Sequence, residues 1–483
     1  MPDDGHPVDL RPTMRGIAAL ALVLGLIALP MLACGGSAGS GDRPPLVVQG
    51  GTLIDGTGAG PVQNGVVVAS RGTIRAAGPA SEVQVPGEAR AVSADGQYIV
   101  PGYIDAHVHY SQTGWFTGRP DAMDLRDRYP YAEVIAGLQS NPGRFFGSYL
   151  CSGVTGTFDV GGYPWTRDLE ARGERDPDAP RVETAGPLLS TVDFWLNLPD
   201  QRQFIHMAND SIVRRTVRSH ARLGSSAIKV WFITPPQPPD SARASRLVST
   251  ADEEAEKFDL PLIVHATGLW EAKEAVRSGA EVLVHSVFSD TVDQEFIDLA
   301  AENDVAYITT ITVQEGYRNA GGGKALSEYP YPTACVDSTT RARIAEGVPE
   351  EMQPDGEVGS GVTPSMEVAI ENARRLHEAG VTVAMGTDAG NPGTLHGPSV
   401  YREMELLSMA GMSPGEVLVA STRNAARAMG RDEDLGTLEP GKLADLVVLE
   451  ENPLDSVANF SSVSRVVKDG WVVWSEEATG GGE

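Results

Sequence analysis

The sequence predicts an α/β protein in which a (β/α)8 barrel of the TIM type carries a small β-sandwich built from both chain ends. Two sequence patterns lead to this prediction, and the histidine positions and the chain length agree with it. Short apolar runs alternate with helical patterns through the middle of the chain, and β-type runs with turn dipeptides occur at both ends. Four of the nine histidines also stand where apolar runs end. The length of 483 residues suits one large barrel with a satellite domain.

The first 45 residues read as an export signal followed by a linker. An uncharged apolar run, 16–33, follows Arg11 and Arg15, which is typical of a signal peptide spanning residues 1–33, and a flexible Gly/Ser-rich linker, 34–45, comes next. Leu32-Ala33-Cys34 resembles a bacterial lipobox, so we expect a lipid on Cys34 and an exported, membrane-anchored lipoprotein in the periplasm or at the cell surface of a bacterium. Simple secretion and an uncleaved anchor are the alternatives, because 18 apolar residues are just long enough to span a bilayer.

Two terminal segments, 46–100 and 437–476, are expected to form the sandwich together. Both contain short β-type runs separated by turn dipeptides such as Asp55-Gly56 and Asp469-Gly470. Neither segment alone has enough strands to bury a sheet face, and chain termini commonly lie close in space. Residues 477–483 are expected to be a disordered tail.

The barrel is expected to occupy residues 101–436. Eight apolar runs predict its strands, at 101–109, 154–160, 182–188, 227–232, 261–265, 282–285, 306–310 and 381–386. Helical patterns such as 291–303 and 367–379 separate most of them. The segment 312–365 exceeds ordinary loop length, so we expect it to serve as a lid or a substrate wall.

The composition is that of a folded, acidic protein. Hydrophobic residues make up 41% and charged residues 21%, which excludes a disordered or collagen-like chain. The net charge of −27 is not offset by any basic cluster, so no nucleic-acid partner is expected. Three cysteines are too few for a disulfide framework or a Cys-based zinc site, so a metal would have to bind to histidines and carboxylates.

Histidines at strand ends indicate a metal site. His107 and His109 close the first strand, and residues i and i+2 of a strand face the same way, so both imidazoles are expected in the barrel mouth. His265 and His285 end neighbouring strands, and Asp388 follows the last one. Neutral imidazoles with a carboxylate suit Zn²⁺ or a similar divalent ion. Satisfied core histidines, and a helix-capping role for Asp388, are the alternatives.

Lys229 stands inside an otherwise apolar strand, 227–232. An unpaired buried ammonium is costly, so the side chain either reaches solvent or faces the metals. Beside metal ions it would have to lose its positive charge. Carboxylation of the amine by CO₂ would turn it into an anionic bridge.

These segments together resemble the amidohydrolase superfamily. The likeness rests on Pro101–His109, Gly386–Gly390 and the long stretch Gly436–Leu449, while Gly153–Gly162 is similar to the second-strand segment of the prolidase-like, imidazolonepropionase-related branch. The resemblance implies two divalent ions, with zinc expected, bound to six side chains: His107, His109 and Asp388 on one ion, His265 and His285 on the other, and a carboxylated Lys229 bridging both together with a hydroxide. It also implies that Asp388 moves the proton of that hydroxide to the leaving nitrogen. His396 matches a family position near the substrate, or else is only a helix-start residue.

The expected function is therefore hydrolysis of a carbon–nitrogen bond in a small molecule, first of all a dipeptide or an N-acyl amino acid. Ring-opening hydrolysis of a cyclic amide or lactone, deamination at a single metal, and a non-catalytic binding lipoprotein are the alternatives. Deaminases of the superfamily carry a Glu three residues after the fifth-strand histidine, but His265 is followed by Ala-Thr-Gly. The proline-rich segment 234–239 replaces a Gly-rich loop of relatives at the expected substrate mouth, so their specificity does not carry over.

Two expectations concern the insertion. Its arginines Arg318, Arg341 and Arg343 could bind a substrate carboxylate bidentately or simply form a solvated charged face. Cys151 precedes the second strand and Cys335 follows the seventh, so we expect them on opposite faces of the barrel and both free. The sequence leaves the substrate, the native metal and the oligomeric state open.

Overall fold

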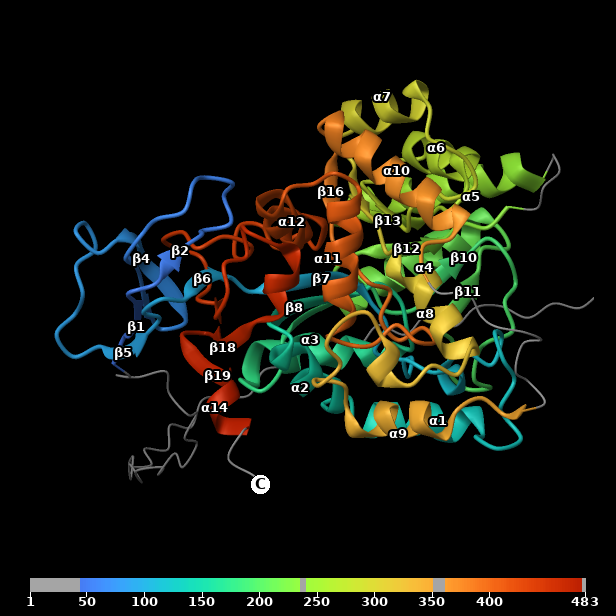
Figure 1. Ribbon diagram of the computed structural model, residues 1–483. Coiled ribbons are helices and arrows are strands. Elements are labelled where there is room, and N and C mark those ends of the chain that lie inside the picture. The colour runs from blue at the N-terminus through green and yellow to red at the C-terminus, as the bar shows by residue number, and fades with distance from the viewer. Residues whose placement is uncertain (1–43, 235–239, 351–360, 480–483) are drawn as a thin grey trace, which may run out of the picture. The chain divides into compact units, whose positions relative to one another are not determined.

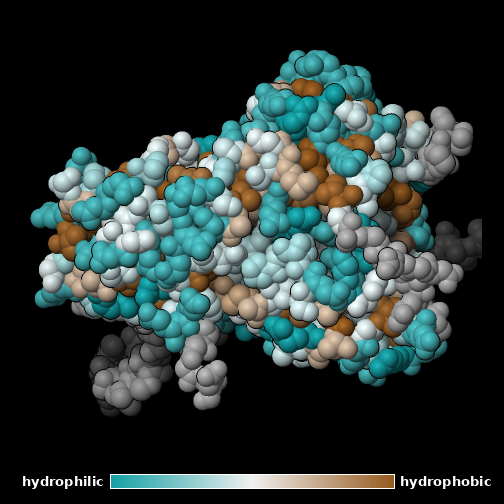
Figure 2. Space-filling model, viewed as in Figure 1, coloured by the Kyte–Doolittle hydropathy of each residue, from teal (hydrophilic) through white to brown (hydrophobic). Residues whose placement is uncertain are grey.

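The structure is a computed structural model that describes residues 44–234, 240–350 and 361–479. The expected signal peptide, the expected lipidation site Cys34 and nearly all of the expected linker lie outside the described residues. So do most of the proline-rich loop and part of the insertion. In the described ranges, no helix is long and apolar enough to cross a membrane. Hydrophilic side chains cover most of the face shown in Figure 2.

Parallel strands form the barrel in the expected chain order (Figure 1). One sheet contains β7 (Tyr103–Val108), β8 (Val154–Asp159) and β9 (Arg181–Thr184). The other contains β11 (Phe204–His206), β10 (Leu188–Ser190), β12 (Ile228–Trp231), β13 (Leu262–His265), β14 (Val282–Val284), β15 (Ala306–Ile308) and β16 (Thr382–Ala384). Backbone hydrogen bonds join the two sheets, from Ala106 to Met385 at 3.3 Å and from Ser226 to Thr184 at 3.0 Å.

The expected third strand, 182–188, is two strands. β9 ends at Thr184 and pairs with β8, whereas β10 begins at Leu188 and pairs with β12. Gly186 between them has a φ of 75°, a left-handed conformation that breaks the ladder, and Pro187 has no backbone N–H to restore it. The chain then makes a detour through 191–203 before β11 pairs with β10.

Helices cover the outside of the barrel, and apolar side chains fill its inside, among them Ile104, Phe158, Ile263 and Ile308. The helices are α1 (Tyr131–Ser140), α2 (Arg144–Cys151), α3 (Asp168–Arg175), α4 (Asp210–Leu223), α5 (Asp240–Ala255), α6 (Leu269–Arg277), α7 (Gln294–Glu302), α10 (Pro364–Glu378), α11 (Ser399–Met409), α12 (Pro414–Ser421) and α13 (Arg423–Ala428). The helices expected over 291–303 and 367–379 correspond to α7 and α10. Each begins at a side-chain cap, since Asp293 accepts from the N–H of Phe296 in α7 and Thr363 does the same for α10.

The two chain ends build the sandwich, as expected. One sheet contains β4 (Thr73–Pro79), β3 (Gly65–Ser70), β1 (Leu46–Gln49) and β5 (Arg90–Ser93). The other contains β19 (Trp471–Ser475), β18 (Val463–Lys468), β17 (Leu446–Leu449), β6 (Tyr98–Pro101) and β2 (Thr52–Leu53). β6 pairs antiparallel with β17, so a strand from each end lies in the same sheet (Figure 1). A short helix, α14 (Glu476–Thr479), follows β19, so residues 477–479 of the expected disordered tail are helical.

The insertion folds into helices that lie along the barrel wall. α8 (Thr312–Gly321) begins it, and α9 (Ser338–Glu346) follows further along. Its contacts lead back to α2 and α11, since the Tyr331 hydroxyl lies 3.1 Å from Ser399 Oγ and the Arg144 guanidinium lies 3.8 Å from the Asp337 carboxylate.

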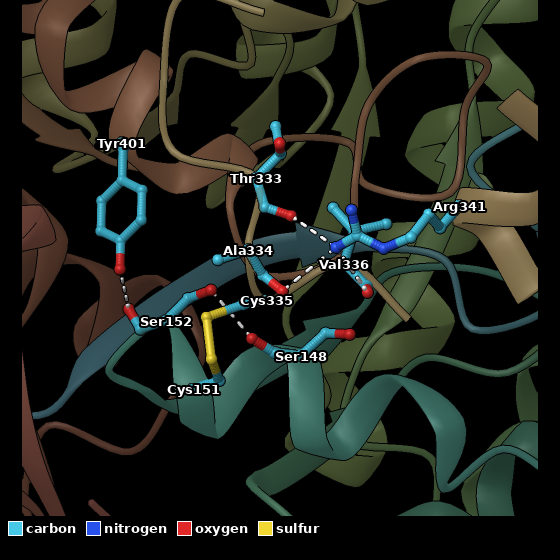
Figure 3. Close-up of a disulfide and its surroundings, with 9 residues drawn as sticks. All are labelled: Ser148, Cys151, Ser152, Thr333, Ala334, Cys335, Val336, Arg341 and Tyr401. Atoms are coloured by element: carbon cyan, nitrogen blue, oxygen red, sulfur yellow. Dashed lines mark hydrogen bonds between the residues drawn. A yellow bond between two sulfur atoms is a disulfide. The ribbon is translucent and has the colours of Figure 1, made fainter. Parts of the chain in front are cut away.

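Cys151 and Cys335 form a disulfide, so the expectation of two free thiols is wrong (Figure 3). Their Cα atoms lie 5.7 Å apart although 184 residues separate them in sequence. The expectation placed Cys335 near the barrel mouth, but the insertion is long enough to run back beside α2 and reach its last residue, Cys151. The bond therefore ties the insertion to the barrel wall.

Candidate metal centre

Two imidazoles and a carboxylate converge at the mouth of the barrel. The Nε2 atoms of His107 and His109 lie 3.3 Å apart, and Asp388 Oδ1 lies 3.4 Å from the first and 3.1 Å from the second. All three side chains are buried, and their ligand atoms lie within 4.8 Å of one another. This spacing and donor set suit a divalent cation.

Three of the buried histidines have lowered pKa values. Burial lowers the pKa of His107 well below its ordinary value, and the nearby Lys229 and other histidines add to this shift. The pKa values of His265 and His285 are lowered in the same way, mainly by burial. Neutral imidazoles keep a lone pair for a metal.

Hydrogen bonds outside this cluster orient two of the rings. His109 Nδ1 lies 2.7 Å from the carbonyl oxygen of Gly161, so Nδ1 carries the proton and Nε2 is the basic nitrogen. His285 Nδ1 lies 2.8 Å from the Thr310 hydroxyl. In the described part of the chain, Asp388 Oδ1 accepts no hydrogen bond. A buried carboxylate oxygen without a donor is available to bind a cation.

The second histidine pair lies against the first. The ring centroids of His265 and His285 are 4.4 Å apart, and those of His285 and His107 are 4.7 Å apart. These side chains, with Lys229, line one cavity of about 380 Å³. The six residues that the sequence singled out as ligands therefore meet in one cavity.

Two buried lysines of this chain differ in their surroundings. Lys468 is buried in the sandwich, and its Nζ donates to the carbonyls of Gly173 and Asp176 at 2.6 and 2.9 Å. Lys229 is 3% exposed, yet its Nζ has no partner among the described residues. Burial lowers the pKa of Lys229 to about 7, so much of this amine is neutral near neutral pH. The alternative in which Lys229 reaches solvent does not fit this burial.

Three residues at the strand ends hold a backbone conformation that side chains disfavour. The φ angles of His285, Thr310 and Asp388 are 73°, 48° and 62°. For a β-branched residue such as Thr310 this is a genuine outlier, and such strain commonly occurs at functional sites.

Two buried carboxyls support the loops that carry these residues. Asp105 accepts hydrogen bonds from the N–H and hydroxyl of Thr387 at 2.9 and 2.6 Å. Glu403 of α11 accepts from the N–H groups of Ile311 and Thr312 at 2.9 and 2.7 Å, at the start of α8. Burial raises the pKa of each carboxyl to about 7.

His396 lies behind the cluster and is not among the cavity-lining residues. Its ring stacks on Phe145 with centroids 3.6 Å apart, and its Nε2 lies 3.2 Å from the carbonyl oxygen of His109. Burial lowers its pKa to about 3. In this structure it contacts the backbone of a candidate ligand and does not reach the cavity.

α8 supplies part of the cavity wall through Val313, Gln314 and Tyr317. Most of the proline-rich loop expected at the mouth lies outside the described residues. Only its first residue, Thr234, is described, and its hydroxyl donates to Glu271.

Arg119 is the cavity-lining cation that sequence reasoning missed. Its guanidinium pairs with Asp121 at 2.7 Å and donates to the side-chain oxygen of Asn391, which also accepts from the Tyr317 hydroxyl at 2.8 Å. Its place ten residues after His109, in the loop that follows the first strand, was the signal that could have found it.

The three arginines of the insertion do not line this cavity. Arg341 donates to the carbonyls of Thr333, Ala334 and Val336 (Figure 3), and Arg343 pairs with Glu346. Arg318 donates to the carbonyl of Gly361.

The sequence profile of the Amidohydrolase family matches residues 98–473, which span β6, the whole barrel and most of the C-terminal strands. The chain belongs to the amidohydrolase family. It is thus a metal-dependent enzyme acting on carbon–nitrogen bonds, and the fold and the metal-site candidate agree with that membership.

The chain is also similar to individual proteins of known activity and to solved structures. The chain is 28% identical to an imidazolonepropionase of Rhizorhabdus wittichii, over 83% of this chain and 92% of the relative. It is 26% identical to an ochratoxinase of Aspergillus niger, over 89% and 88%. Among solved structures, a Xaa-Pro dipeptidase with bound methionine in its active site shares the fold, with a TM-score of 0.66 and 22% identity over 89% of this chain and 100% of that one.

Proposed function

We propose that this amidohydrolase cleaves the amide bond of a dipeptide or an N-acyl amino acid, using two divalent ions, with zinc as the expected metal. The observation that carries this proposal is Lys229, whose buried and unpartnered Nζ lines the same cavity as the four histidines and Asp388. A positively charged lysine is not a ligand for a single metal ion, whereas a carboxylated lysine is an anion that can bind two metal ions.

The chemistry of Lys229 fits that role. Its neutral amine attacks the carbon of CO₂, a C–N bond forms, one proton is released, and the product carries a negative carboxylate. Burial favours the neutral amine, since it lowers the pKa of Lys229 to about 7. The proposed ligand sets are His107, His109 and Asp388 for one ion, His265 and His285 for the other, with Lys229 between them.

Bound divalent ions would supply Lewis-acid chemistry, lowering the pKa of a water and polarising the substrate carbonyl. Asp388 acts as the proton carrier: its carboxylate accepts a proton as water adds to the carbonyl carbon, and returns it to the amide nitrogen as the C–N bond breaks. The products are a carboxylic acid and an amine.

Arg119 is the proposed anchor for the substrate carboxylate. Its guanidinium has five N–H donors, of which Asp121 and Asn391 take three. The remaining donors belong to a side chain that lines the cavity, whereas Asp121 does not line it. A carboxylate next to the scissile bond is the feature that dipeptides and N-acyl amino acids share.

The test combines metal analysis with a substrate screen. Protein reconstituted with zinc and bicarbonate should bind two ions per chain and release amines from dipeptides or acylated amino acids. Lys229→Ala should lose the second ion and activity, while Lys257→Ala, at an exposed lysine of the 3-10 helix Glu256–Phe258, should behave as wild type. Full activity of Lys229→Ala with two bound metals would overturn the bridge.

The imidazolonepropionase relative supports a second candidate, ring opening of a cyclic amide or lactone. The same screen separates the two, because ring opening consumes substrate without releasing a second molecule. Ammonia release from nucleobases would instead indicate a deaminase. Binding of these compounds with no metal uptake and no turnover would indicate a binding protein.

We also propose export and lipid anchoring at Cys34. The disulfide between Cys151 and Cys335 supports an oxidising compartment, where such bonds persist. The intact mass of membrane-extracted protein tests the anchor: a chain that begins at Cys34 with added lipid mass is expected, and an unmodified chain would contradict it.

A further inference from the structure

One wall of the cavity beside the metal centre consists of aromatic rings. Phe194, Phe204 and Trp231 all line the cavity, and their ring centroids lie 4.9, 4.9 and 5.2 Å apart. Leu188 and Leu196 line it as well. We call the three rings the aromatic wall. The proposed metal chemistry does not require such an apolar surface.

Asn197 fixes the aromatic wall. Its Oδ1 accepts from the backbone N–H groups of Gln203 and Phe204 at 2.9 and 3.0 Å. Its Nδ2 donates to the carbonyls of Phe194 and Phe204, both at 3.2 Å. One side chain thus connects the backbone at both phenylalanines across the detour 191–203. Because these rings are already held in place, little further conformational entropy is lost when a ligand binds to them.

The aromatic wall adjoins the second histidine pair. The ring centroids of Trp231 and His265 lie 6.0 Å apart, and these residues stand opposite each other in the pairing of β12 with β13. Lys229 stands two residues before Trp231 in β12, so both side chains project to the same side of the strand.

The proposed carboxylate anchor is connected to Asp388 through Asn391. Arg119 donates to the side chain of Asn391, and Asn391 Nδ2 donates to the carbonyl of Asp388 at 3.1 Å. Asp388 is the group that returns a proton to the leaving nitrogen. The leaving amine and its carboxylate therefore belong on the side of Arg119, and the acyl group belongs on the side of the aromatic wall.

We infer that Phe194, Phe204 and Trp231 form the acyl subsite, and that the substrate's acyl part carries an aromatic or bulky apolar group. This inference rests on the proposed function and adds to it a side of the scissile bond and a chemical class. Aromatic rings pack edge-to-face or offset against one another, as Phe194 packs edge-to-face against Phe204 and Trp231, so a substrate ring can join them.

The test uses two isomers with the same amide and carboxylate, N-phenylacetyl-L-alanine and N-acetyl-L-phenylalanine. The first has its ring on the acyl side and the second on the leaving amine. For the metal-loaded enzyme we expect kcat/KM to favour the first isomer by about 10- to 100-fold, the range that burial of an apolar group provides. N-acetyl-L-alanine, which has no ring, should resemble the second isomer or be poorer.

Variants identify the wall as the cause. Phe194→Ala should reduce the preference to near unity, and Phe194→Leu, which keeps apolar volume and should fold well, should reduce it in part. Phe258→Ala removes a phenylalanine that is 41% exposed and outside the cavity, so it should keep the full preference. Circular dichroism checks that each variant is folded.

The outcomes separate this inference from the proposed function. Hydrolysis of all three amides without a preference, or with a preference that Phe194→Ala leaves unchanged, would overturn the acyl subsite while amide hydrolysis stands. A preference for N-acetyl-L-phenylalanine would overturn the orientation. If no amide is cleaved, the proposed function fails, and calorimetry with phenylacetate decides the subsite: binding that Phe194→Ala abolishes supports it, and no binding overturns it.

Discussion

The Thr310 hydroxyl holds the imidazole of His285 by its Nδ1 atom at 2.8 Å. This contact leaves Nε2 as the nitrogen for a metal, because one ring nitrogen of a ligating histidine is usually oriented by such a partner. Thr310 itself stands in a left-handed conformation with a φ of 48°. The Glu403 carboxylate, by binding the Thr309 hydroxyl and the N–H groups at the start of α8, supports that turn from both sides.

Thr310→Val should weaken the metal centre without unfolding the chain. The change keeps the branched shape and removes only the oxygen, and loss of such an orienting partner typically costs about 10- to 100-fold in metal affinity or activity. Competition with a chelator measures the affinity. Thr250→Val is the matched control, since that hydroxyl bonds within α5 to the Arg246 carbonyl. Equal zinc affinity of both variants would show that Thr310 does not orient the ligand.

Arg119→Met should raise KM for carboxylate substrates by at least about tenfold, because it removes a charge-assisted contact. The diagnostic comparison uses a substrate whose carboxylate is replaced by a primary amide. Wild type should lose affinity for this analogue, and the variant should treat both compounds alike. Arg126→Met, on the same loop but paired with Asp124 in solvent, should match wild type. A carboxylate preference that survives in Arg119→Met would place the anchor elsewhere.

The stabilising contribution of Glu403 to the metal-free protein should fall as pH rises from about 5 to 7. Burial raises the pKa of Glu403 from 4.5 to about 7, so in this interval the folded state binds a proton that the unfolded state has released. One such group changes the free energy of unfolding by at most about 1.4 kcal/mol per pH unit.

Glu403→Gln removes this titration, so the free energy of unfolding of the variant relative to wild type should rise between pH 5 and 7, measured by urea unfolding between pH 5 and 8. Chelator-treated protein is required, because bound metal would add its own pH dependence. Glu302→Gln, on the exposed end of α7, should keep the wild-type slope. A Glu403→Gln protein with an unchanged slope would show that this carboxyl is not the one that titrates.

The disulfide should stabilise the chain by constraining its unfolded state. Replacing Cys151 and Cys335 by serine should lower the free energy of unfolding by about 2–4 kcal/mol, the typical range for such bonds. A chain that starts at residue 44 should show no titratable thiols in denaturant until it is reduced, and two afterwards. Two titratable thiols before reduction would show that Cys151 and Cys335 are free and that the disulfide is absent.

The strand-end residues of the site were predictable from sequence because a local rule decides their position. His107 and His109 are spaced by two on one strand, and His265 and His285 end strands that follow each other, so parallel pairing alone brings them to one rim. The pairing of the two chain ends followed from the same kind of reasoning, since each end lacked a partner for its strands.

The features that sequence reasoning missed depend on the paths that long loops and insertions take through the structure. Cys335 reaches Cys151 because the insertion turns back along α2, and no periodicity encodes such a path. The aromatic wall arises because the third strand breaks at Gly186 and the chain makes a detour, so Phe194 enters the cavity from a segment that reads as loop. Arg119 likewise lies in a loop, and the composition of a loop does not predict which way a side chain points.

The pairing of β6 with β17 has a consequence for how the protein is made. β6 emerges from the ribosome long before β17, by on the order of tens of seconds at ordinary rates of synthesis. Until then, one edge of the early strand has no neighbour to bond with, and open strand edges invite association with other chains. A product cut short before residue 446 could never fill that edge. The terminal sandwich can therefore close only after the last strands have been synthesised.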